Sequence, residues 1–88
     1  MTDLVLKEET YDRFVVLYDL VGLVGEGIAT ESALASSARL SQDVVRQMLA
    51  FMLGQGYIRT TPSNGEFRIT ALGSDLLREF LGMRRFLS

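Results

Sequence analysis

The sequence predicts one small α+β domain that is mainly helical, with a two-stranded hairpin in front of its last helix. Three observations favour this class. The chain has 88 residues, of which 48% are hydrophobic and 23% charged, and this length and composition suit one globular core. Apolar residues recur at helical spacing before residue 55 and again after residue 70. Between these segments, two short alternating runs flank Pro62, the only proline.

We expect the first helix over residues 10–24, after an N-terminal extension at residues 1–9. Thr10 is a suitable N-cap, and the glycines that begin at Gly22 end the helix. Its apolar residues form two neighbouring stripes, so the helix should bury more than one side. The first stripe is Tyr11, Phe14, Val15, Tyr18 and Val21, and the second is Leu17, Leu20 and Val24.

Two further helices are expected over residues 30–37 and 41–54, after a very short strand at residues 28–29. Thr30 and Ser41 precede them as N-caps, because a hydroxyl at this position can accept an N–H of the first turn. The second of these helices stops where Gly54 or Gly56 can adopt the left-handed conformation. Its inward residues are Val45, Met48, Leu49 and Met52.

The stretch "YIRTTPSNGEFRIT", residues 57–70, predicts a β-hairpin. Its turn contains Asn64-Gly65, which accepts positive φ. Alternation directs Ile58, Phe67 and Ile69 inward, and it directs Arg59, Arg68 and Glu66 outward. Thr70 then caps a last helix over residues 71–86.

This order of elements resembles the winged helix-turn-helix domains of transcriptional regulators of the MarR and PadR type, and it looks closer still to small archaeal winged-helix regulators. The resemblance rests on Leu40-Ser41, Leu49, Leu53, Gly56-Tyr57-Ile58 and "FRITALGSDLL", within residues 10–82. It implies that residues 41–54 form a recognition helix and residues 57–70 a wing. The chain departs from the pattern at Leu72, where the family often has a basic residue.

The resemblance implies binding of double-stranded DNA, and the outward residue types fit this chemistry. An arginine can donate two hydrogen bonds to guanine, a glutamine amide can pair with adenine, and a carboxylate can accept a hydrogen bond from cytosine. Alternatively, the same residues form a solvated helix face, and Glu66 neutralises the two hairpin arginines. The candidate base-reading residues are Gln42, Asp43, Arg46 and Gln47, and the candidate phosphate or minor-groove residues are Ser41, Arg59, Ser63, Asn64 and Arg68.

The apolar residues exceed what one small core needs, which predicts a homodimer with two recognition helices roughly 34 Å apart. The alternative is a wider core in a monomer. The expected dimer interface is Leu17, Leu20, Val24, Phe80, Met83 and Leu87.

Charge is divided along the chain. Residues 1–38 carry two basic and seven acidic side chains, and residues 39–88 carry seven arginines and four acidic side chains, so −5 and +3 give the net charge of −2. This asymmetry suits a one-sided binding surface. A continuous positive strip through Arg46, Arg59 and Arg68 would favour DNA. Interruption of that strip by Glu31, Asp43 and Glu66 would favour the alternative, a winged-helix module that binds another protein and not DNA.

The composition excludes several other functions. The chain has no cysteine and no histidine, so we expect no metal, no cofactor and no enzymatic activity. "GLVGEG" lacks the spacing of a dinucleotide-binding loop. Asp19, Gly22 and Glu26 interrupt the apolar stretches and the N-terminus is acidic, which predicts a cytoplasmic protein without a membrane span or a secretory signal.

Overall fold

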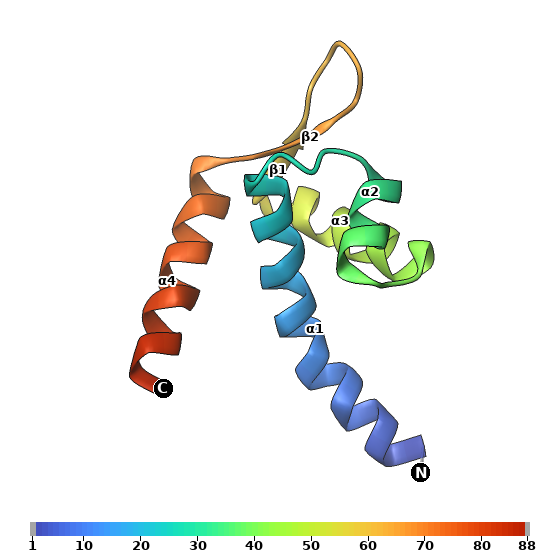
Figure 1. Ribbon diagram of the computed structural model, residues 1–88, viewed down its shortest axis with the longest axis vertical. Helices are drawn as coiled ribbons and strands as arrows, with labels where there is room; N and C mark the ends of the chain where they lie inside the picture. The colour runs from blue at the N-terminus through green and yellow to red at the C-terminus, as the bar shows by residue number, and fades with distance from the viewer. Residues whose placement is uncertain (1, 88) are drawn as a thin grey trace.

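The computed structural model describes the backbone of residues 2–87 and the side chains of residues 13–82. Within this range the chain forms a mainly helical α+β domain in the predicted order. The elements are α1 (Thr2–Gly25), α2 (Glu31–Ala38), α3 (Gln42–Gln55), β1 (Ile58–Thr60), β2 (Phe67–Ile69) and α4 (Ala71–Leu87). Figure 1 shows α1 in the centre, α4 on one side of it, the α2–α3 pair on the other, and the hairpin at one end.

Helix α1 begins at Thr2 and not at Thr10, so the expected N-terminal extension is helical. The first turns of α1 are helical for a local reason. The first turns contain Leu, Lys and Glu, which favour helix, and Asp3 lies where a negative charge stabilises the helix dipole. These turns extend beyond the other helices in Figure 1.

Side-chain caps define the starts of the other helices, as predicted. The hydroxyl of Thr30 accepts from the N–H of Ala33 at 3.2 Å, and that of Ser41 accepts from the N–H of Val44 at 3.3 Å. The C-cap of α3 is Gly56, with φ of 82°, a conformation that glycine adopts without steric cost. Local signals therefore specify the starts of α2 and α3 and the end of α3.

The hairpin is antiparallel, with Ile58 opposite Ile69 and Arg59 opposite Arg68. Ile58 is buried, while Ile69 packs half-buried against the core, and both arginines are exposed. Residues 28–29 do not form the expected strand, but the carbonyl of Ala29 accepts from the N–H of Phe67 at 2.9 Å. One backbone hydrogen bond therefore joins this segment to the edge of the hairpin.

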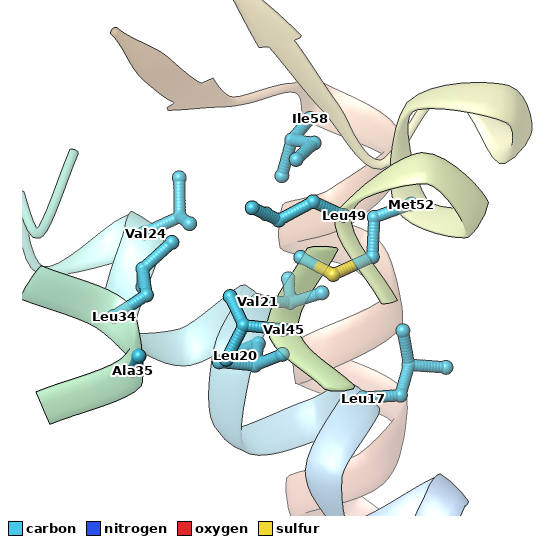
Figure 2. Close-up of a cluster of buried hydrophobic side chains, with 10 residues drawn as sticks. All are labelled: Leu17, Leu20, Val21, Val24, Leu34, Ala35, Val45, Leu49, Met52 and Ile58. Atoms are coloured by element: carbon cyan, nitrogen blue, oxygen red, sulfur yellow. The ribbon is translucent and has the colours of Figure 1, made fainter. Parts of the chain in front are cut away.

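The core lies where α1 meets α2, α3 and β1 (Figure 2). It consists of Leu17, Leu20, Val21, Val24, Leu34, Ala35, Val45, Leu49, Met52 and Ile58. Leu20 and Val24 are only 0% and 3% exposed, and Leu17 is also buried. The prediction that these three residues form a dimer interface is wrong, because side chains that fill the core of one subunit cannot contact another.

The rest of the expected dimer interface lies on α4. Phe80 is half-buried and stacks on Tyr18 of α1, with ring centroids 3.9 Å apart. It therefore joins α4 to α1 within one subunit. The side chains of Met83 and Leu87 lie outside the described residues.

Candidate nucleic-acid interface

The exposed side of α3 is set by the side that the helix buries. Val45, Leu49 and Met52 enter the core, so the residues between them point outward. We call the outward polar residues of its first half the reading face; they are Gln42, Asp43, Arg46 and Gln47, all exposed. Ser41 caps this end, and the free N–H groups and the helix dipole favour an anion there.

Arg46 does not extend freely from the reading face. Its Nη2 lies 3.1 Å from Oε2 of Glu31, and its Nε donates to Oε1 of the same carboxylate at 3.4 Å. Asp43 adds a weaker contact, 4.0 Å from Nη1. The hydrogen bond and the charge of Glu31 raise the pKa of Arg46 above its usual value.

Gln42 is also held by α2. Its Nε2 donates to the hydroxyl of Ser32 at 3.3 Å. The first turn of α2 therefore contacts two of the four residues of the reading face. Asp43 and Gln47 make no side-chain hydrogen bond to another described residue.

On the hairpin, Arg59 and Arg68 lie side by side on the exposed face of the paired strands. Oε1 of Glu66 lies 3.6 Å from Nη2 of Arg68, so the alternative of neutralisation by Glu66 holds for one of the two arginines. Such an exposed pair contributes about 0–1 kcal/mol, so a phosphate can replace Glu66. Arg59 forms no ion pair with any of the side chains described in residues 13–82.

The hairpin tip is ordered by its own side chains. Oδ1 of Asn64 accepts from the N–H of Glu66 at 3.1 Å and also from the hydroxyl of Thr61. Gly65 follows with φ of 70°. The side-chain oxygen of Asn64 is thus used inside the turn, and its amide nitrogen and the exposed Ser63 are what the tip offers to a partner.

The positive surface is therefore interrupted. Glu31 and Asp43 flank Arg46, and Glu66 pairs with Arg68. These three carboxylates are the ones expected to break a positive strip. Which of them pairs with Arg46 was not predictable, because Glu31 and Arg46 are 15 residues apart and meet only where α2 and α3 cross.

Apolar side chains adjoin the reading face. Phe14 of α1 is 63% exposed, and Phe51 and Val44 of α3 are also exposed. Phe14 and Phe51 lie on a groove of about 410 Å³ between the two helices, which we call the α1–α3 groove. It is lined by Arg13, Phe14, Leu17, Gln47, Met48 and Phe51. Phe14 belongs to the first apolar stripe of α1, which was expected to be buried, and its exposure is a correction.

A wider groove of about 710 Å³ lies between α1, α4 and the end of α2. Leu77 and Phe80 contribute apolar surface, and Asp19, Glu26 and Arg39 supply charges. None of the predicted DNA-binding residues lines it.

The described residues offer neither a candidate metal site nor a candidate membrane-spanning helix. In the part of the chain that the structure describes, no three acidic side chains converge as metal ligands would. No helix there combines the length and the hydrophobicity needed to cross a bilayer.

Comparison with known proteins identifies the class of protein. A family model described as winged helix-turn-helix matches residues 11–88. The chain therefore belongs to the winged helix-turn-helix family, in which α2 and α3 are the helix-turn-helix and the hairpin is the wing. The MarR- or PadR-like subtype stays a prediction. No curated protein and no solved structure matches the chain significantly.

Proposed function

We propose that the protein binds double-stranded DNA and acts as a small transcriptional regulator. The observation that carries the proposal is family membership together with an α3 whose polar side is exposed and whose N-terminus is capped and open. In a helix-turn-helix, the second helix enters the major groove and its first exposed residues meet the bases. Arg46, Gln42 and Gln47 read bases in this proposal, and Asp43 accepts from cytosine.

The wing contacts the phosphate backbone beside the groove. Arg59 and Arg68 share one exposed face, and Ser63 and Asn64 lie at the tip, towards the minor groove. The hydroxyl of Ser41 donates to a phosphate while its oxygen caps α3. With two or three phosphates neutralised, log affinity falls with log salt by roughly 2–3, a shallow slope for a DNA-binding protein.

The protein is cytoplasmic in this proposal and uses no cofactor, metal or catalytic step. A homodimer would place two α3 helices on one DNA duplex. Its interface uses exposed apolar residues, since Leu17, Leu20 and Val24 are in the core. Phe14 and Val15 of α1 and Leu81 of α4 are exposed and apolar.

The test of DNA binding is fluorescence anisotropy with a mixture of labelled random duplexes, over a series of salt concentrations starting at about 50 mM. Arg59→Ala should weaken binding and reduce the salt slope by about 0.9, because one phosphate contact is lost. Arg78→Ala is the matched control. It removes the same charge from α4, where Arg78 contacts Asp75, and it should leave affinity and slope unchanged.

A specific observation favours a second candidate, a module that binds another protein. Carboxylates balance Arg46 and Arg68, and Phe14, Val44 and Phe51 expose apolar surface beside them. Absence of DNA binding by the wild type at about 50 mM salt, where phosphate contacts are strong, would reject the first candidate and favour this one. Equal effects of Arg59→Ala and Arg78→Ala would reject the assigned wing contact.

A further inference from the structure

We infer that Glu31 is a specificity-determining residue, which positions Arg46 so that the guanidinium presents one edge to guanine. This inference rests on the proposed DNA binding and assigns to α2 a role in base selection. Helices α2 and α3 meet at this pair. Both carboxylate oxygens of Glu31 accept from Arg46, from Nη2 at 3.1 Å and from Nε at 3.4 Å. Two parallel hydrogen bonds fix the plane of the guanidinium as well as its place.

Because Glu31 binds one edge of the Arg46 guanidinium, only the remaining donors are available to a base. Glu31 takes the N–H of Nε and one N–H of Nη2. The remaining edge consists of Nη1 and the second N–H of Nη2, which are parallel donors. Two parallel donors match O6 and N7 of guanine in the major groove. The pair with Glu31 is therefore compatible with guanine recognition, and it selects which side of Arg46 takes part.

Glu31 is itself well placed to hold an arginine. It lies in the first turn of α2, directly after the cap Thr30, where the helix dipole stabilises a carboxylate. Its side chain is 31% exposed, whereas that of Arg46 is 65% exposed. The carboxylate is thus the better-anchored partner, and Arg46 projects from it towards solvent.

Fixing Arg46 before binding has a thermodynamic consequence. A free arginine side chain populates many rotamers and loses this freedom when it meets a base. An arginine already held in plane loses less of it, and turning towards a phosphate or a different base requires breaking both hydrogen bonds to Glu31. Removing Glu31 should therefore reduce discrimination between bases more than it reduces total affinity.

A second contact of the same kind supports the assignment. The Gln42 amide donates to Ser32, the residue after Glu31, at 3.3 Å. Its Oε1 and one N–H are left for a partner. Two neighbouring residues of α2 thus orient two residues of the reading face that are one helical turn apart.

Glu66 provides the matched control. Its Oε1 lies 3.6 Å from Nη2 of Arg68, and its side chain is 36% exposed, close to the 31% of Glu31. Glu31→Gln and Glu66→Gln each remove one negative charge from beside an exposed arginine at nearly constant side-chain volume. Attraction to DNA rises in both variants, and only Glu31→Gln loses the bidentate contact that holds Arg46.

The experiment is selection from a random duplex library, with sequencing of bound DNA, for four full-length proteins: wild type, Arg46→Ala, Glu31→Gln and Glu66→Gln. Circular dichroism melting checks that each variant is folded. Arg46→Ala identifies the position at which Arg46 selects guanine. At that position, Glu31→Gln should lower the preference for guanine about tenfold, and Glu66→Gln should keep it. Binding of both variants to random DNA should equal or exceed that of the wild type.

Three results would overturn the inference. In the first, Glu31→Gln keeps the guanine preference that Arg46→Ala loses. In the second, Glu31→Gln and Glu66→Gln change this preference equally, so that charge alone acts. In the third, Arg46→Ala changes no position although the wild type selects DNA. In all three cases DNA binding itself stands. Failure of the wild type to retain any duplex at about 50 mM salt rejects the proposed function, and the inference with it.

Discussion

Gly73, in the first turn of α4, lies against Tyr57 and Ile69 of the wing. A Cβ added there would lie 2.2 Å from the carbonyl oxygen of Tyr57 and 2.9 Å from a side-chain carbon of Ile69. The first of these neighbours is backbone, which cannot move aside like a flexible side chain. Glycine is needed at this position because of space, and not because of its φ angle.

At the residue scale, we predict that Gly73→Ala destabilises the fold by about 1–3 kcal/mol, the usual cost of overpacking. Gly54→Ala is the control: it lies in α3 with nothing within 4 Å of the added Cβ. Alanine there should stabilise the protein by about 0.5–1 kcal/mol, because it favours helix. Urea denaturation followed by circular dichroism measures both. Equal effects of the two changes would contradict the packing explanation.

At the scale of elements, Thr70 joins the hairpin to α4. Its hydroxyl lies 2.5 Å from the carbonyl oxygen of Gly56 and 3.0 Å from that of Tyr57, and it accepts from the N–H of Gly73 at 3.1 Å. One side chain therefore caps α4 and ties it to the end of α3. The start of α4 is fixed relative to the wing by this residue.

We predict that Thr70→Val lowers the free energy of unfolding by about 1–2 kcal/mol, because the cap and the hydrogen bond to the end of α3 are both lost at constant volume. Thr60→Val is the control, since Thr60 is exposed on β1 and its side chain forms no hydrogen bond with a described residue. Thermal unfolding compares the two variants. A Thr60→Val effect as large as that of Thr70→Val would show that β propensity, and not the cap, dominates.

At the scale of the whole molecule, folding brings acidic and basic residues together that are separate in the sequence. The acidic part, residues 1–38, contributes Glu31 to the side of the basic recognition helix. The molecule measures 45 × 30 × 22 Å. Its length comes from α1 and α4, which extend away from the hairpin (Figure 1). Phe14 and Val15 of α1 and Leu81 of α4 are exposed apolar residues on these two helices.

We predict that the protein self-associates through these helices, and that Phe14→Asp and Leu81→Asp together shift it towards the monomer, because each places a charge in an apolar contact. Leu53→Asp is the control, an equally drastic change of an exposed leucine on α3. Sedimentation velocity over a range of concentrations measures the shift. A wild type that sediments as a monomer at every concentration would contradict the homodimer, as would a Leu53→Asp variant that dissociates like the double variant.

Much of the fold was predictable because its signals are local. Thr30, Ser41 and Thr70 cap helices through a residue three positions ahead, and Gly56 ends α3 through its own backbone conformation. Such contacts depend on neighbours in the chain. The helix order, the hairpin and the exposed side of α3 follow from them and from periodicity. The start of α1 was not predictable from the cap at Thr10, because helix-forming residues continue in front of it.

What the sequence alone determined is therefore the class of fold, the position of the wing and the set of polar residues on the recognition helix. Only the tertiary structure decided which apolar stripe of α1 is buried, because that depends on where the other helices pack. It also decided that Arg46 meets Glu31 while Arg68 meets Glu66. The first of these pairs joins residues on two helices, and its geometry comes from the angle at which α2 and α3 cross.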